Sequence, residues 1–189
     1  MNRVAVFCGS SSGNNPIYKE QAEIVGKTLA RRGIELVYGG GRVGLMGILA
    51  DGALNEGGKV TGSIPGFLHT KEIAHGKLTK LYSVETMHNR KAIIYDQCDG
   101  AIALPGGYGT LDEMFEMLTW GQLGLHQKPV AMLNINGYFD DVIAMADKMV
   151  EEGFIKPVNK DMLLIGEDID LLLEEMINYI PPDVPKWIK

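Results

Sequence analysis

The chain has 189 residues, of which 46% are hydrophobic and 22% are charged, a composition typical of one globular domain and unlike that of a disordered chain. Its formal net charge of −6 argues against a long basic surface for a nucleic-acid polymer, so any phosphate-bearing partner is expected to be small. No apolar run reaches the ~20 residues of a membrane span, and the first residues lack the pattern of a signal peptide, so we expect a cytoplasmic protein with no membrane partner.

The first predicted strand, residues 4–7, ends in the polar turn Cys8-Gly9-Ser10-Ser11-Ser12-Gly13. Doubly wound sheets place ligands at the turn that follows their first strand. The turn lacks the G-x-G-x-x-G spacing of a dinucleotide site, so it is equally consistent with ligand contact and with a plain loop. Pro16 then opens a helix predicted over residues 16–32.

A second glycine-rich turn, Gly39-Gly40-Gly41-Arg42-Val43-Gly44-Leu45-Met46-Gly47, follows a strand predicted over residues 34–38. Two such turns in one domain are less expected by chance than one. After a helix to about residue 55 and a strand over 59–64, the chain becomes polar and irregular. His69 and His75 lie in that stretch without partners at metal-ligand spacing, so we expect both on the surface.

The helix predicted over residues 86–97, after a strand over 78–84, places Arg90 on its inward face. Arg90 falls on the same i, i+3, i+4 pattern as the apolar side chains of this helix. An unpaired buried charge is costly, so the guanidinium needs a partner. Two interpretations remain open, a structural ion pair and a clamp for an anion or a substrate.

The most informative stretch follows a buried strand predicted over residues 100–104 and reads Pro105-Gly106-Gly107-Tyr108-Gly109-Thr110-Leu111-Asp112-Glu113. We expect Thr110 to open an amphipathic helix here. Glycines let the backbone approach a ligand closely, and a helix start presents unpaired N–H groups to a phosphate. The alternative is a capping box, in which Thr110 and Glu113 satisfy each other's backbone donors.

The rest of the chain continues the alternation of strands and helices. The helix after the glycine-rich motif carries Leu111, Met114, Phe115 and Leu118 on a stripe that we expect to be core. The alternation predicts an α/β fold, a single Rossmann-like domain over residues 1–189 whose doubly wound parallel sheet has helices on both faces. The remaining predicted elements are strands over 129–133 and 162–165, helices over 111–122, 138–152 and 169–179, and an extended proline-rich tail over 181–189.

The two cysteines, Cys8 and Cys98, show no metal-ligand spacing. We expect both to be buried thiols in a reducing compartment, and we expect no metal site.

Several motifs, in order, resemble those of the Lonely Guy (LOG) family of phosphoribohydrolases. The stretch from Pro105 to Glu113 resembles the family's P-G-G-x-G-T-x-x-E signature, and Met87-His88-Asn89-Arg90-Lys91 matches its M-H-x-R-K. The resemblance extends to the turns after the first two predicted strands and to Thr119-Trp120-Gly121-Gln122-Leu123-Gly124. It covers roughly residues 4–154.

The resemblance implies an enzyme that forms homodimers or higher assemblies, with a homodimer expected here. It implies hydrolysis of the N-glycosidic bond of cytokinin nucleoside 5′-monophosphates, or of AMP, without a cofactor. It implies Arg90 and Glu113 as the catalytic pair. Many relatives have glutamate where this chain has Asp112, which puts the ribose contact of that residue in doubt. Relatives have also been labelled lysine decarboxylases, but the sequence has no persuasive lysine site for pyridoxal phosphate. The implied substrate contacts are Glu72, Lys91, Gly106, Gly107, Tyr108, Gly109, Thr110, Asp112 and Thr119.

Two other functions compete with this hypothesis. Molybdenum-cofactor carriers are similar in fold and in their glycine-rich turn, so the chain could bind a nucleotide or that cofactor without catalysis. Retention of both Arg90 and Glu113 favours the enzyme, because simple binding does not require the pair. A structural or regulatory oligomer is the second alternative, and it predicts no response to nucleotides.

Overall fold

The computed structural model describes residues 1–68 and 74–182. Within these residues, seven strands form one sheet in the order β4-β3-β2-β1-β5-β6-β7, and all neighbouring strands run parallel. This confirms the predicted doubly wound α/β fold. The strands are β1 (Arg3–Phe7), β2 (Glu35–Tyr38), β3 (Val60–Pro65), β4 (Lys80–Val84), β5 (Gly100–Ala103), β6 (Val130–Leu133) and β7 (Leu163–Gly166).

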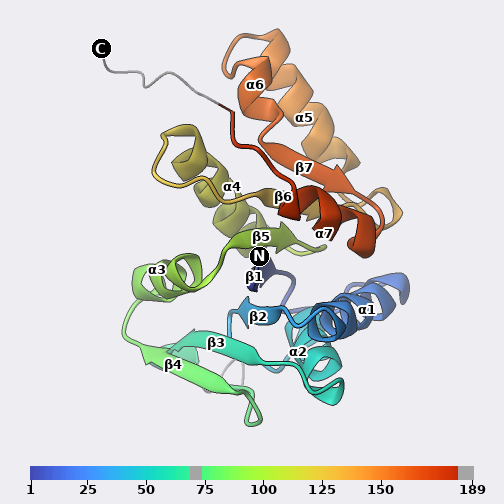
Figure 1. Ribbon diagram of the computed structural model, residues 1–189, viewed down its shortest axis with the longest axis vertical. Helices are drawn as coiled ribbons and strands as arrows, with labels where there is room; N and C mark the ends of the chain where they lie inside the picture. The colour runs from blue at the N-terminus through green and yellow to red at the C-terminus, as the bar shows by residue number, and fades with distance from the viewer. Residues whose placement is uncertain (69–73, 183–189) are drawn as a thin grey trace.

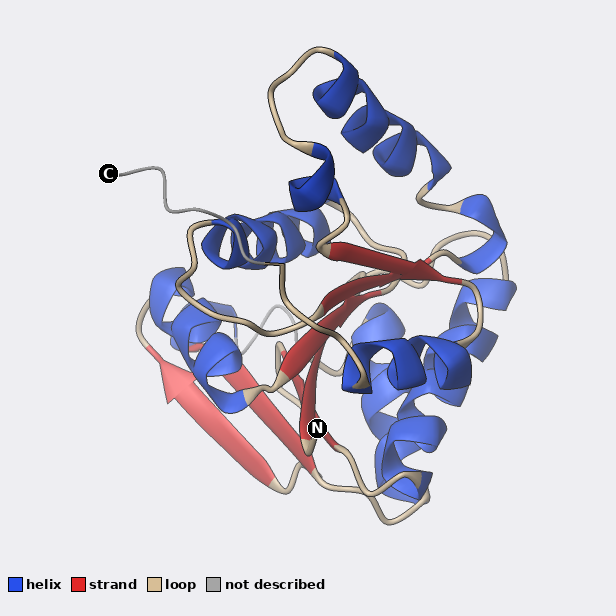
Figure 2. Ribbon diagram, turned by 45° about the horizontal axis from the view of Figure 1, so that its top comes forward, coloured by secondary structure: helices blue, strands red, loops and turns tan. Residues whose placement is uncertain are grey.

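Helices cover both faces of the sheet (Figures 1 and 2). Side chains alternate across a strand, so Val4 and Val6 of β1 join one core cluster while Ala5 and Phe7 join the other. The first cluster includes residues of α1, α2 and α7, and the second includes residues of α3 and α4 and packs against α5. The helices are α1 (Ile17–Arg31), α2 (Gly44–Asn55), α3 (Met87–Gln97), α4 (Tyr108–Gln122), α5 (Asp140–Glu151), α6 (Pro157–Lys160) and α7 (Ile169–Ile177).

The order of the strands reverses between β1 and β5, which lie side by side near the middle of the sheet. Crevices at such a reversal, outside the carboxyl ends of the strands, are the usual ligand sites of open α/β sheets. The loops that follow β1 and β5 are joined there, because Gly9 N donates to the Pro105 carbonyl at 3.0 Å. The fold therefore brings the turn after the first strand beside the glycine-rich motif.

The start of α4 differs from the sequence prediction. The helix begins at Tyr108 with Gly107 as its N-cap, so the expectation that Thr110 opens it was wrong. Both Thr110 N and Leu111 N donate to the Gly107 carbonyl, at 3.1 and 3.3 Å, and the first turn is thereby already closed. Thr110 lies inside the helix, so the capping box that competed with the phosphate interpretation does not form.

Two further expectations about single residues were wrong. His75 is not on the surface but only 4% exposed, since its main-chain N donates to the Gly40 carbonyl at 3.0 Å and holds it against the turn after β2. Its Nε2 lies 3.1 Å from Asp51 Oδ1, and its Nδ1 accepts from Lys77 N. Phe115 is 36% exposed rather than core, because α4 turns Met114 and Met117 fully inward instead. His69 and Glu72, like most of the predicted tail, lie outside the described residues.

None of the helices in the described part of the chain is long and apolar enough to cross a membrane.

Candidate functional site

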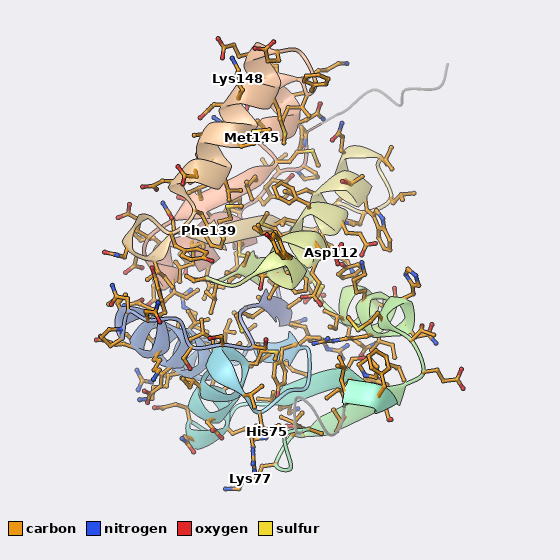
Figure 3. All side chains as sticks on the ribbon, turned by 180° about the vertical axis from the view of Figure 1, so that it is seen from behind. His75, Lys77, Asp112, Phe139, Met145 and Lys148 are labelled. Carbon is orange, nitrogen blue, oxygen red and sulfur yellow. The ribbon has the colours of Figure 1, made fainter. Side chains whose placement is uncertain are left out.

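A cavity of about 260 Å³ opens at the carboxyl ends of β1 and β2, beside the start of α4. It is bounded by the loop after β1, the glycine-rich turn after β2, and the facing ends of α3 and α4. Figure 3 labels Asp112, which lies on α4 at the rim of this cavity. The lining residues are Val6, Phe7, Cys8, Ser10, Gly39, Met46, Met87, Arg90, Gly107, Tyr108, Gly109, Thr110, Asp112 and Glu113.

Arg90 is 6% exposed, which confirms that it points inward from α3. Its Nη2 donates to the Gly39 carbonyl at 3.2 Å, and its Nη1 lies 3.9 Å from the Met87 sulfur. A Cβ at Gly39 would stand 1.9 Å from Nη2, so the turn after β2 must have glycine there to admit the guanidinium. The Thr86 hydroxyl caps the start of α3 by accepting from Asn89 N at 3.1 Å, which fixes the turn that carries Arg90.

Glu113 reaches the same cavity from the second turn of α4. The thiol of Cys8, at the end of β1, lies within electrostatic reach of both charged groups. Burial raises the pKa of the Cys8 thiol far above its ordinary value, the Glu113 carboxylate raises it further, and Arg90 opposes the shift. Cys8 is therefore a neutral thiol in the wall of the cavity, whereas Arg90 and Glu113 supply its charges.

The first turn of α4 has the geometry of an anion site. The amides of Tyr108 and Gly109 stand at the open end of the helix, where N–H groups have no intrahelical acceptor and the dipole favours negative charge. An added Cβ at Gly107 or Gly109 would meet nothing within 4 Å, and neither residue has a positive φ. The fold itself therefore does not need glycine at either position, and the space beside the amides is open to a ligand.

Gly106 has a different role from these two glycines. A Cβ at Gly106 would stand 2.1 Å from the Thr110 hydroxyl oxygen and 2.8 Å from Gly9 N, so its lack of a side chain lets the loops after β1 and β5 meet. Gly106 borders a neighbouring hollow of about 220 Å³ rather than the cavity itself, and its carbonyl accepts from the Tyr138 hydroxyl at 2.6 Å.

Besides Gly106, two further predicted substrate contacts, Lys91 and Thr119, do not line the cavity. Lys91 Nζ lies 3.2 Å from Asp112 Oδ2 and 2.9 Å from Glu116 Oε2, and so bridges α3 to α4. The Thr119 hydroxyl donates to the Phe115 carbonyl at 2.7 Å, two turns further along α4 than Asp112. Within the described residues, Arg90, Glu113, Gly107 to Thr110 and Asp112 are the predicted positions that line one cavity.

Sequence reasoning did not single out Cys8, Ser10, Gly39, Met46 or Met87 as site residues, although they line the cavity. The available signal was the pair of polar, glycine-bearing turns after the first two strands. A larger hollow of about 370 Å³ lies at the opposite edge of the sheet, beside Arg3, Glu35 and Lys59. It contains none of the predicted site residues, so size alone does not identify the site.

Known proteins resemble this chain in sequence and in fold. Residues 46–176 match the family model described as possible lysine decarboxylase. The chain is 44% identical to the cytokinin riboside 5′-monophosphate phosphoribohydrolase LOG1 of Arabidopsis thaliana. The aligned region of 179 residues covers 95% of this chain and 84% of that protein. The chain is 46% identical over 179 residues to the probable phosphoribohydrolase LOGL2 of Oryza sativa subsp. japonica, across 95% of this chain and 73% of that one.

Among solved structures, the molybdenum cofactor carrier protein of Chlamydomonas reinhardtii superposes with a TM-score of 0.72 at 18% identity, covering 94% of this chain and 99% of that chain. The molybdenum cofactor binding protein of Rippkaea orientalis superposes with a TM-score of 0.68 at 21% identity, covering 94% of this chain and 98% of that chain. At these identities the likeness shows a common fold and carries no functional conclusion.

Proposed function

Because the chain belongs to the LOG family of phosphoribohydrolases, we propose that it hydrolyses the N-glycosidic bond of nucleoside 5′-monophosphates of the cytokinin type, or of AMP. The products are the free base and ribose 5-phosphate. The observation that carries the proposal is that Arg90 and Glu113, from two different helices, line one cavity beside the open amides of a helix start. A phosphate anchor next to a carboxylate is the arrangement that this reaction needs.

The chemistry of the bond explains the need for a carboxylate. Cleavage of an N-glycosidic bond develops positive, oxocarbenium-like charge on the ribose, as in glycoside hydrolysis. We propose that the Glu113 carboxylate stabilises this charge and orients the attacking water. Arg90 then orients the substrate and Glu113, in keeping with its fixed position on the Gly39 carbonyl.

The phosphate anchor holds the bond in place for that attack. In this proposal the backbone of residues 107–110 cradles the 5′-phosphate, which converts binding energy into orientation of the ribose over Glu113. Tyr108 is 94% exposed at the mouth of the cavity and is available to contact the nucleotide. Asp112 lies at the rim with its shorter carboxylate already close to Lys91, so we assign it a secondary part in ribose binding.

The oligomeric state, the partner and the location of the enzyme are also part of the proposal. The exposed apolar side chains of α4 and the segment after it, Tyr108, Phe115, Leu123 and Leu125, support a homodimer formed through this helix. The acidic charge of the chain favours a small nucleotide over a nucleic-acid polymer. We further propose a cytoplasmic location, where two buried free thiols persist.

The test is to incubate the purified protein with AMP and with isopentenyladenosine monophosphate and to follow the release of free base. We expect base and ribose 5-phosphate from at least one of them, and the ratio of kcat/KM values then identifies the preferred base. Nucleotides that survive for hours while raising the melting temperature would instead support a carrier. No reaction and no thermal shift would support a structural oligomer.

The variant Glu113→Gln tests the catalytic assignment. Glutamine preserves the size of the side chain but removes the negative charge, so we expect kcat to fall by roughly 10²- to 10⁴-fold in a folded protein. The matched control is Glu175→Gln on the exposed face of α7, which should turn over at the wild-type rate. Near wild-type turnover in Glu113→Gln would remove Glu113 from the mechanism.

A further inference from the structure

Tyr95 occupies the junction of the three elements that supply the cavity's charged and buried groups. Its side chain is 4% exposed and projects from α3, one turn beyond Arg90. The ring packs edge-to-face on Phe7 of β1 at 6.2 Å between centroids and on Trp120 of α4 at 5.2 Å. Phe7 itself lines the cavity and Tyr95 does not, so Tyr95 joins α3 to β1 and α4 behind the cavity wall.

The hydroxyl of Tyr95 is directed at the turn of α4 that bears Glu113. It lies 2.7 Å from Glu116 Oε2 and 3.2 Å from the main-chain carbonyl oxygen of Glu113, so its proton is shared between two acceptors on one helical turn. The Glu116 carboxylate is held in turn by Lys91 Nζ at 2.9 Å. These contacts cross between α3 and α4, and the three side chains that make them, Tyr95, Glu116 and Lys91, are not among the residues that line the cavity.

The hydroxyl remains a donor under ordinary conditions. Burial raises the pKa of Tyr95 well above its usual range, and the carboxylates of Glu116, Glu113 and Asp112 raise it further. A neutral phenol next to a carboxylate forms a charge-assisted hydrogen bond, which is stronger and more directional than a neutral one. The contact is therefore suited to fixing the relative placement of α3 and α4.

We propose that Tyr95, acting through Glu116 and the Glu113 main chain, is a positioning residue that sets the register of Glu113 on α4 against Arg90 on α3. The inference rests on the proposed function, because the register matters only if these two side chains act on one substrate. Tyr95 touches no reacting atom. Its effect is on orientation, where a displacement of about 1 Å can cost up to a hundredfold in rate.

The test is the variant Tyr95→Phe, which keeps the ring and its packing and removes the hydroxyl alone. We expect kcat with the preferred nucleotide to fall about tenfold to a hundredfold, while KM stays within about twofold because the phosphate cradle is untouched. Loss of one buried hydrogen bond should lower the melting temperature by only about 2–4 °C. A merely structural tyrosine predicts the same thermal shift with an unchanged kcat.

The matched control is Tyr82→Phe on the edge strand β4, whose hydroxyl meets Lys80 Nζ at 2.5 Å in an exposed position. It should leave kcat and KM unchanged. Glu116→Leu approaches the contact from the other helix and retains Tyr95, so it should lower kcat in the same direction. This second variant keeps the test decisive if Tyr95→Phe does not fold.

These experiments distinguish a failure of the positioning role from a failure of the proposed function. If the wild-type enzyme is active and Tyr95→Phe has the same kcat, the positioning role alone is overturned. If Tyr95→Phe does not fold, a wild-type kcat in Glu116→Leu leads to the same conclusion. A wild-type protein that releases no base overturns the proposed function and this inference with it. A fall in kcat with unchanged KM in a folded variant supports the inference.

Discussion

The pairing of a glycine with an arginine is the most specific single-residue feature of the site. Gly39 leaves the space into which the Arg90 guanidinium fits, and the Gly39 carbonyl accepts its hydrogen bond. The two residues are 51 positions apart in the sequence. The glycine is explained by the arginine and not by a turn conformation, because its φ is not positive.

We predict that Gly39→Ala separates stability from activity. The added Cβ would meet the far end of a flexible side chain, so Arg90 can move aside and the free energy of unfolding should change by no more than about 1–2 kcal/mol. The displaced guanidinium should lower kcat by at least about tenfold. Denaturant unfolding and steady-state kinetics measure the two effects.

The control for this variant is Gly76→Ala, where an added Cβ meets nothing within 4 Å and the φ is not positive. That change should leave both stability and turnover near wild type. Wild-type turnover in Gly39→Ala would contradict the role given to the position of Arg90.

At the scale of an element, the glycines at the start of α4 have two different roles, which the sequence alone does not distinguish. Gly106 lacks a side chain because the loops after β1 and β5 meet there, whereas Gly107 and Gly109 have open space around them. A helix position is less stable with glycine than with alanine by up to about 1 kcal/mol. The helix therefore keeps a destabilising residue at Gly109 that its own packing does not require, which is expected where a ligand approaches the backbone.

We predict that Gly109→Ala shifts stability and binding in opposite directions. The free energy of unfolding should rise by about 0.5 kcal/mol, since alanine is the better helix former and has room for its methyl group. The methyl group should obstruct the phosphate and raise KM for the nucleotide by about tenfold, as expected when a charge-assisted hydrogen bond is weakened. Thermal unfolding measures the expected gain in stability, and steady-state kinetics with AMP measures the expected rise in KM. An unchanged KM would exclude a phosphate at this turn.

At the scale of the whole molecule, four exposed apolar side chains follow one another along α4 and the segment after it. Tyr108 and Phe115 are seven residues apart and share a face of α4, and Leu123 and Leu125 follow at its end. Exposed apolar surface of this kind marks interaction sites. It adjoins the cavity mouth through Tyr108, so association through α4 would also enclose the site.

We predict that the wild-type protein has about twice the 20.7 kDa mass of one chain in solution and that the double variant Phe115→Asp/Leu125→Asp is monomeric. A carboxylate in the centre of an apolar interface is costly to desolvate. Light scattering after gel filtration gives the masses. Met145→Asp, at a 54% exposed position on α5 apart from α4 (Figure 3), is the control and should remain dimeric. If the double variant is still dimeric, the interface does not lie on α4.

The sequence alone determined the α/β alternation, the inward direction of Arg90 and the two glycine-rich turns, because these depend on local periodicity and on the chemistry of glycine and proline. It did not determine where α4 begins or why His75 is buried. The helix begins where the Gly107 carbonyl accepts its first hydrogen bonds, and His75 is tied to the distant turn after β2, where the Gly40 carbonyl accepts from His75 N at 3.0 Å.

Only the tertiary structure decided which glycines serve the fold and which leave space for a ligand, since that depends on what an added Cβ would meet. It also decided that Lys91 bridges to Asp112 and Glu116 rather than lining the cavity, and that Tyr95 reaches the Glu113 turn. Local sequence sets the period and the caps of each element, whereas these contacts join residues far apart in the chain and form only once the sheet has brought their elements together.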